Sequence, residues 1–460
     1  MSQSLDYDPA LSYSKKIRSH PTYRHTKQYQ IAGGQTVTLS AGSTTESVFE
    51  LPSSSHVLNH AKSYLKFTLN VAAAPNPGYN RLLMNGVSMI DRIMLQTKSG
   101  IQLCDVTNVP NYTTMVNPYL TKLSDFVTRD SPGPLAADAC ISDNNMMNPS
   151  RVAIADGSNI LPNGVEAGAG VIDFSDLSGY FRSALEAGAG QSALFMNVLL
   201  PMSVIAPDTI LSLDRDMFYG ETLLLYVYWS QTSKIGFVGT HATVLATAVG
   251  APTGMTLSRL ALYTAIESNV EIQNGLMAKA HSEGGISMMI PYVYGYKTTT
   301  PASTSSSIQT RLSRAHGLNL LRVWTSIFHA NSTLQFTNLN SNAANAIWVD
   351  VYDELNSQRL SDFNWSSAAN ELYLALRDKL EGSVIQNSAM FRDNQCWLRD
   401  WTNLKCVDFI ENNTSEDGVS LAQEQIYTTN INKANAVNII FTFVVTQKIL
   451  NIGSAGVTLM

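Results

Sequence analysis

The sequence has few charged residues. Only 14% of its 460 residues are Asp, Glu, Lys or Arg, against about a quarter in an ordinary soluble protein. This shortage argues against a helical bundle, whose exposed faces need Glu, Lys and Arg. It suits short strands joined by polar loops, and it suits broad flanks buried against other copies of the chain, because interface cores are depleted in charge.

The sequence also lacks the short motifs of common metal and nucleophile sites. His56 and His60 have a spacing seen in zinc sites, but HVLNH lacks the Glu of that motif, and there is no HxH pair. Cys396 and Cys406 could supply two thiolates, yet no third ligand follows nearby, and GxSxG is absent. We therefore predict no catalytic residue, no metal and no cofactor.

Long apolar runs are missing too. The longest, ALFMNVLLPMSVIA at 193–206, is short and contains Pro201, so we expect no membrane-spanning helix. Cys104, Cys140, Cys396 and Cys406 are scattered without a CxxC pair, which predicts reduced structural thiols. The net charge of -6 argues against a general nucleic-acid binder.

One segment departs from this acidic balance. No acidic residue occurs between Asp8 and Glu46. We interpret residues 1–35 as a basic arm that is solvated or ordered by a partner, with contact to lipid headgroups or nucleic acid as the alternative. Its candidate contact residues are Lys15, Lys16, Arg18, Arg24 and Lys27. We predict that deleting residues 1–34 leaves trimers intact but weakens higher assembly.

Strand-like runs dominate the rest of the chain. They mix β-branched and aromatic residues and are bounded by Gly, Pro, Asn or Ser, which predicts an all-β protein. The runs are 36–40, 63–71, 193–201 and 221–229 in the first half, and 255–266, 286–296, 346–353 and 436–447 in the second.

The length predicts two domains, and a Gly/Ala/Thr-rich stretch at 234–254 is a natural connection between them. A weak echo between the halves indicates a duplicated domain. It pairs SYLKF at 63–67 with SRLAL at 258–262, GVSMIDRIM at 86–94 with GLNLLRVW at 317–324, and KLSDF at 122–126 with RLSDF at 359–363.

The stretch LDRDMFYGETLLLYVYW at 213–229 raises the question of catalysis. On a strand, Asp214 and Asp216 would project to one side, as a pair of glycosidase carboxylates must. Arg215 between them, and Gly220 and Glu221 before an apolar strand, favour a solvated rim and a tight turn. We favour the rim.

The same stretch resembles the closing strands of the first jelly roll in double jelly-roll major capsid proteins of double-stranded DNA viruses. GVSMIDRIMLQTKSGIQL at 86–103 and NYTTMVNPYL at 111–120 resemble that family's early strand pair and Tyr-containing helix. AVNIIFTFVVTQKIL at 436–450 is similar to the end of its second jelly roll. The size suits the smaller members, including polinton-like viruses and their relatives.

The resemblance implies two tandem eight-stranded jelly-roll sandwiches with a few short helices in the loops. We place the arm at 1–35, the first jelly roll at 36–236 and the second at 237–460. The implied function is a capsid protein whose homotrimers form pseudo-hexamers that tile an icosahedral shell assembled inside the host cell. Implied partners are other copies, minor capsid and penton proteins and, through the arm, an internal membrane or the genome.

A carbohydrate-binding or carbohydrate-cleaving β-sandwich protein is the alternative. It would need an exposed aromatic platform or a paired acid site. Its candidates are Trp365, Trp397 and Trp401, together with Asp214 and Asp216. Core or interface positions for these tryptophans are the stronger interpretation.

Overall fold

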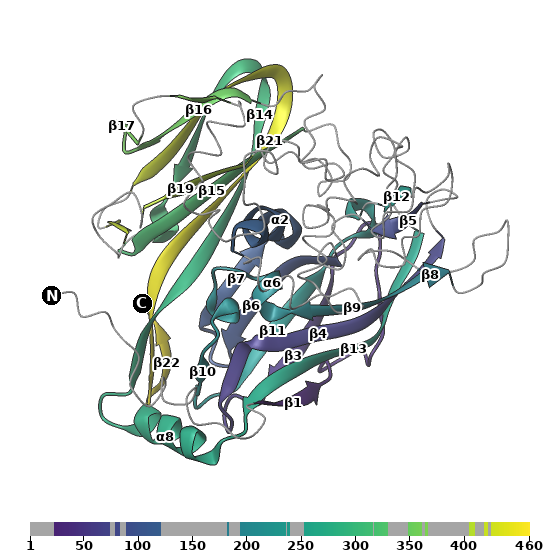
Figure 1. Ribbon diagram of the computed structural model, residues 1–460, viewed down its shortest axis with the longest axis vertical. Coiled ribbons are helices and arrows are strands. Elements are labelled where there is room, and N and C mark those ends of the chain that lie inside the picture. Colours follow the sequence, from purple (N-terminus) through teal and green to yellow (C-terminus); the bar gives the residue numbers. More distant parts are fainter. Residues whose placement is uncertain are drawn as a thin grey trace, which may run out of the picture.

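The computed structural model describes residues 23–73, 79–82, 89–120, 182–183, 194–235, 237–239, 253–315, 317–329, 348–360, 364–366, 404–409, 418–421 and 425–460. Strands dominate this part of the chain (Figure 1). Its α-helices are α2 (Val109–Leu120), α6 (Met202–Ile205) and α8 (Val270–His281). Among the described helices, none has the length and apolar character needed to cross a membrane.

Two sheets build the first half. One has the strand order β1-β13-β4-β9-β8, with β10 also on β4 and β2 on β13, and the other has the order β3-β11-β6-β7. The first sheet contains β1 (Tyr23–Gln28), β2 (Val37–Thr38), β4 (Leu58–Ala73), β8 (Arg182–Ser183), β9 (Leu194–Pro201), β10 (Asp216–Met217) and β13 (Thr253–Glu267). The second contains β3 (Thr45–Leu51), β6 (Ile90–Thr97), β7 (Gln102–Thr107) and β11 (Leu223–Trp229). The short strands β5 (Tyr79–Leu82) and β12 (Phe237–Gly239) form a separate pair.

The two sheets pack face to face because their strands alternate in polarity. Along β11, every second side chain from Leu223 to Trp229 is buried and those between are half-buried. The ring of Trp229 meets Phe67 of β4 edge-on at 5.5 Å, and its Nε1 donates to Oγ of Ser47 at 2.8 Å. The apolar face of β11 therefore forms part of the core of a sandwich.

A long ribbon organises the second half. Strands β14 (Ile286–Arg311) and β21 (Ile426–Gly453) pair along nearly their whole length, with register shifts on either side of Ser303. The ribbon curls over at one end of the molecule (Figure 1). The strands joined to it directly or through β15 and β16 are β15 (Asn319–His329), β16 (Trp348–Leu355), β17 (Gln358–Arg359), β18 (Trp365–Ser366), β19 (Leu404–Asp408), β20 (Val419–Ser420) and β22 (Gly456–Leu459).

The predicted all-β class is confirmed, and each of the eight predicted runs overlaps a strand. The segment 86–103 contains β6, the turn at Gly100 and the start of β7, which pairs antiparallel with β6. The segment 111–120 lies in helix α2. These local features depend on polarity patterns and turn residues, which the sequence shows directly.

The strand after the predicted connection joins the sheet of the first half. Strand β13 pairs with β4 from Thr253 opposite Ala73 to Ile266 opposite Leu58. The predicted domain boundary between residues 236 and 237 stays a prediction. Strand β13 follows this boundary in the chain but pairs with β4, which precedes it. The echo between 63–67 and 258–262 is wrong as a sign of equivalent strands, because those segments lie side by side in one sheet.

Buried contacts join the two halves. One hydrophobic cluster contains Phe49 and Phe67 of the first half together with Phe443 and Ile452 of β21. Helix α2 lies between the halves (Figure 1), and the ring of its Tyr112 is 4.8 Å from that of Phe443. The halves therefore share a core and are not two independent bodies on a linker.

Candidate functional site

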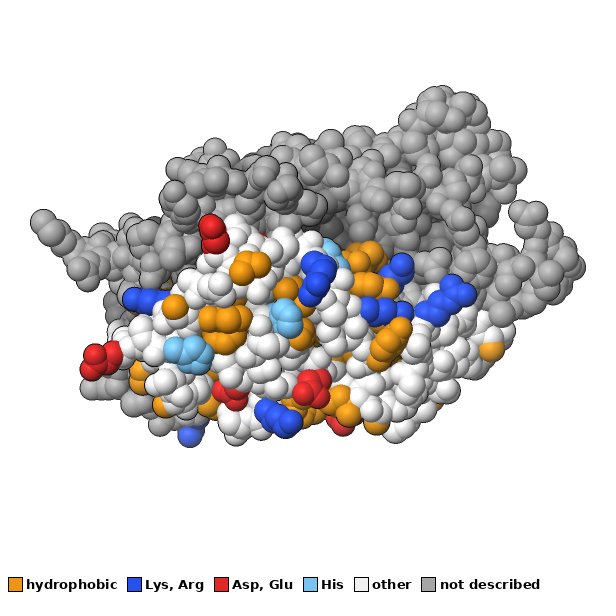
Figure 2. All heavy atoms as spheres, turned by 90° about the horizontal axis from the view of Figure 1, so that it is seen from below, with side chains coloured by type: hydrophobic (Ala, Val, Ile, Leu, Met, Phe, Trp, Pro, Cys, Tyr) orange, Lys and Arg blue, Asp and Glu red, His pale blue; other side chains and the backbone are white. Residues whose placement is uncertain are grey.

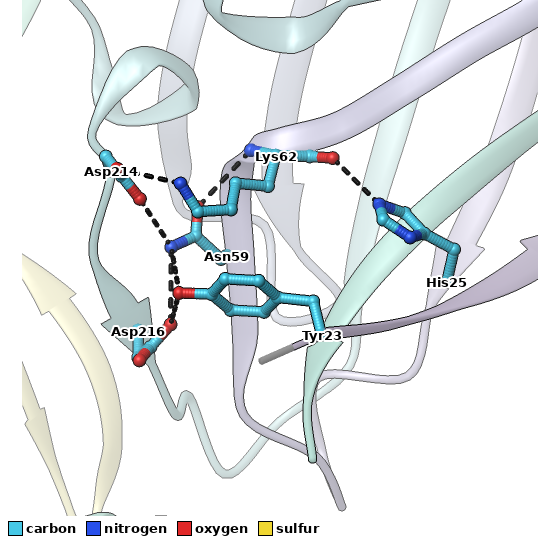
Figure 3. Close-up of polar contacts among 6 residues, drawn as sticks. All are labelled: Tyr23, His25, Asn59, Lys62, Asp214 and Asp216. Carbon is cyan, nitrogen blue, oxygen red and sulfur yellow. Dashed lines mark hydrogen bonds and ion pairs between the residues drawn. The ribbon is translucent and has the colours of Figure 1, made fainter. Parts of the chain in front are cut away.

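The two aspartates lie at the end of the first sandwich where β1, β4 and β10 meet (Figure 3). Asp216 is on β10, directly opposite Asn59 of β4, and Asp214 precedes that strand. Tyr23, the first residue of β1, points into the same cluster from the other side of β4 (Figure 3).

The side chain of Asn59 is the centre of this cluster. Its Nδ2 lies 3.0 Å from Oδ1 of Asp214, 3.2 Å from Oδ1 of Asp216 and 3.1 Å from Oη of Tyr23. Tyr23 donates to Oδ1 of Asp216 at 2.9 Å. Burial, followed by the charge of Asp216, raises the pKa of Tyr23 well above its ordinary value, so its hydroxyl stays a donor.

The two carboxylates differ in exposure but both have partners. Asp216 is 7% exposed, whereas Asp214 is about half-exposed and forms an ion pair with Nζ of Lys62 at 2.8 Å. A catalytic acid would need a proton and an open approach for substrate. Hydrogen bonds with Tyr23 and Asn59 instead make Asp216 a contact between strands. The predicted solvated rim therefore holds for Asp214 and is wrong for Asp216, which is buried.

Glu221 lies in a different place and connects the halves. Its Oε2 accepts a hydrogen bond from Ser99 Oγ at 3.0 Å, and its Oε1 accepts one from the backbone N–H of Val457 at 3.2 Å. Val457 belongs to β22. The three acids of the 213–229 stretch therefore do not converge on one site.

The two histidines of HVLNH have separate hydrogen-bond partners. His60 is fully buried, and its Nε2 is 2.7 Å from Oη of Tyr219. Burial lowers the pKa of His60 to about 4, so its ring is neutral at pH 7. His56 contacts Ser55 Oγ through Nδ1 at 2.8 Å. No cluster of three metal-ligating side chains occurs among the described residues.

The remaining candidates are only partly described. Cys104 and Cys406 are buried free thiols, and Trp365 lies on β18. Cys140, Cys396, Trp397 and Trp401 fall outside the described residues. The aromatic platform of the carbohydrate-binding alternative therefore stays untested.

The end of the predicted arm is a strand. Arg24 and Lys27 are exposed on β1, which pairs with β13 from Tyr23 opposite Glu267 to Gln28 opposite Leu262. The interpretation of a solvated arm is wrong for these residues, while Lys15, Lys16 and Arg18 lie outside the described part. Figure 2 shows the end of the molecule at the bottom of Figure 1, where basic side chains lie among apolar and acidic ones.

No sequence pattern indicates the part-buried ion cluster at the junction of the halves. Arg322 on β15 donates through Nε to Oδ2 of Asp408 at 2.8 Å and through Nη1 to Oδ2 of Asp208 at 2.9 Å. Burial lowers the pKa of Arg322, but the charges of Asp208 and Asp408 more than offset this effect and raise the pKa above its ordinary value. Asp208 and Asp408 are far from Arg322 in the chain, so only the folded structure reveals the cluster.

The architecture is similar to that of solved viral proteins. The mavirus major capsid protein gives a TM-score of 0.51 at 8% identity, covering 98% of this chain and 92% of that one. The chain has the double jelly-roll fold of a major capsid protein. A chain of the Sputnik virophage gives 0.54 at 11% identity over 99% of this chain and 92% of that one. PBCV-1 VP54, fitted into a reconstruction of Sputnik, gives 0.54 at 8% identity over 97% and 99%.

This double jelly-roll similarity is one of structure. No protein-family model matches the sequence, and no curated protein does. Two sheets form the first sandwich of the fold, and the curled ribbon of β14 and β21 organises the second.

Proposed function

We propose that the chain is a major capsid protein whose homotrimers form pseudo-hexamers that tile an icosahedral viral shell. The observation that carries this proposal is the double jelly-roll fold, which this chain shares with the mavirus major capsid protein over 98% of its length. Two sandwiches per chain give a trimer six similar lobes, and six lobes fit a pseudo-hexagonal outline.

The surface supports assembly. Large apolar side chains are exposed in several places, including Ile31 at 58%, Val270 at 64% and Val349 at 57%. Together with the low charge of the chain, such side chains suit contacts between copies. We assign partners accordingly: other copies, minor capsid and penton proteins and, through residues 1–22, an internal membrane or the genome. Assembly takes place inside the host cell.

The proposed role is structural, and the acid cluster agrees with it. Asp214 and Asp216 tie β4 and β10 together, and no observation favours glycan cleavage. In an assay against glycans, we expect neither the wild-type chain nor the Asp214→Asn, Asp216→Asn double variant to release sugar. Hydrolysis by the wild type that the double variant loses would restore the enzyme hypothesis.

The native mass of the purified chain tests the assembly proposal. Sedimentation at several concentrations should give a species of about three times the 50.2 kDa of one chain. A large obligate interface should keep this species intact on dilution. A chain that stays a monomer at every concentration contradicts the proposal.

A further inference from the structure

A buried lysine and a buried aspartate touch inside the second half of the molecule. Nζ of Lys405 on β19 lies against Oδ2 of Asp353 on β16, and each side chain is 2% exposed. Asp353 is opposite Thr429 of β21, and Lys405 is opposite Thr325 of β15, with both threonines buried. The contact is therefore in the interior and not at a solvated edge.

The two strands belong to different parts of the curled sheet. Strand β16 pairs with β21 between Tyr427 and Lys433, whereas β15, which carries β19, pairs with β21 between Asn438 and Gln447. The register shifts near Ser303 on β14 lie between these two parts of the ribbon. The contact thus joins strands that meet only because the ribbon curls.

The surroundings disfavour a charged amine. Burial lowers the pKa of Lys405 to about 7, so a large fraction of its amine is neutral at physiological pH. A buried ion pair is stabilised only if hydrogen bonds satisfy its remaining atoms. Among the described residues, Oδ1 of Asp353 has no hydrogen-bond partner. A neutral amine is then an accessible form of Lys405.

We propose that Lys405 and Asp353 condense into an intramolecular amide bond. Nζ of Lys405 attacks Cγ of Asp353, a bond forms between Nζ and Cγ, and one bond between Cγ and a carboxylate oxygen breaks. That oxygen leaves as water with two of the three protons shared by the ammonium and carboxylate pair, and the third stays on the amide nitrogen. No oxidant, metal or further reactant is needed.

The fold supplies the conditions for this reaction. Two rigid strands hold the nucleophile against the carboxyl group, which replaces an encounter in solution by a fixed approach. An uncharged amine is the nucleophilic form of lysine. The product removes two buried charges and ties two distant parts of the second half covalently. A coat protein exposed to mechanical load gains from such a tie, although the chemistry does not depend on the capsid role.

The intact mass of the full chain decides the matter. After purification and denaturation, the wild-type chain should weigh less than its sequence by the mass of one water. Digestion with trypsin should give a branched peptide that joins residues 323–359 to residues 400–433, with no cleavage after Lys405. A wild-type mass equal to the sequence mass, with both peptides separate, overturns the proposal.

Variants of the two residues identify which side chains form the bond. Lys405→Met should have the full calculated mass, and Asp353→Asn should lose the mass of one ammonia in place of water. Lys433→Met is the matched control, because Lys433 is also buried but donates to the carbonyl of Pro301 at 3.1 Å. It should keep the loss of water. If Lys405→Met does not fold, the wild-type mass and the branched peptide still decide between the two outcomes.

Discussion

At the scale of single residues, His60, Asp216 and Arg322 each have an ionisable group that is held by partners from distant parts of the chain. The partners are Tyr219 for His60, Tyr23 and Asn59 for Asp216, and two aspartates for Arg322. Each arrangement joins segments that lie far apart in the chain. These residues, whose side chains are of the types used in catalysis, therefore form structural contacts here.

His60 should make stability depend on pH. The folded chain binds a proton at His60 only near pH 4, while the unfolded chain binds one near pH 6.5. The contribution of His60 to the free energy of unfolding is then fully present above pH 6.5. It is lost as the pH falls from 6.5 to 4, and its size is about 3 kcal/mol for a shift of this size. In urea unfolding, His60→Gln should flatten this dependence while keeping a partner for Tyr219.

His56→Gln is the control for that experiment, since it makes the same change at a half-buried position four residues away. It should leave most of the pH dependence in place. Equal flattening by both variants would contradict the assignment to His60.

The sequence could predict that Asp214 lies at a solvated rim, but it could not predict that Asp216 is buried in a cluster. Arg215 and Gly220 favour a rim by local chemistry alone. Nothing near Asp216 indicates Asn59 or Tyr23, which reach it only through the pairing of β10 with β4, of β4 with β13 and of β13 with β1. The same applies to Lys405 and Asp353.

At the scale of elements, positions with special backbone geometry separate one strand or helix from the next. Gly285 follows α8 and precedes β14 with a φ of +57°, and a Cβ there would lie 2.5 Å from the carbonyl oxygen of Ile452. Gly284 has open space around it. The turn therefore requires glycine at position 285 but not at position 284.

Gly285→Ala should lower the unfolding free energy by about 1–3 kcal/mol, because the added Cβ strains the left-handed backbone and meets the carbonyl. Gly284→Ala, the matched control, should change it little. Thermal unfolding of both variants checks this, and a Gly285→Ala variant as stable as wild type would contradict the turn geometry.

The first strand gives a second prediction at this scale. Residues 1–22 precede β1, whereas residues 23–34 contain it, so the two parts of the predicted arm should behave differently. Deleting residues 1–22 should leave the thermal midpoint and the trimers unchanged and weaken higher assembly. Deleting residues 1–34 should also lower the unfolding free energy by a few kcal/mol, at about 1 kcal/mol for each lost strand hydrogen bond.

The same midpoint for both deletions would show that β1 adds no stability, against its pairing with β13. Full shell formation without residues 1–22 would show that they take no part in assembly.

Strand polarity and turn residues predicted where strands lie but not how they pair. The alternation along 223–229 and the run at 255–266 are local signals, and both became strands. Strand β13 joins β4 in the first sheet because tertiary packing, which leaves no local trace, selects its partner. The arm was misread for a related reason. The run from Tyr23 to Gln28 is polar because all its side chains are exposed or half-buried, although its backbone pairs with β13.

At the scale of the whole molecule, the two halves form one body with a shared core. The cluster of Arg322, Asp208 and Asp408, the contact of Tyr112 with Phe443 and the hydrogen bond from Val457 to Glu221 all cross the junction. A rigid pair of sandwiches is what a tiling unit requires, because a loose pair could not present fixed flanks to its neighbours.

Negative-stain electron microscopy of the purified protein tests the central claim most directly. We predict particles with a six-sided outline, each built from three two-lobed chains. The account would be contradicted by two-lobed single particles that do not associate, even at protein concentrations well above the dissociation constant expected for the interface.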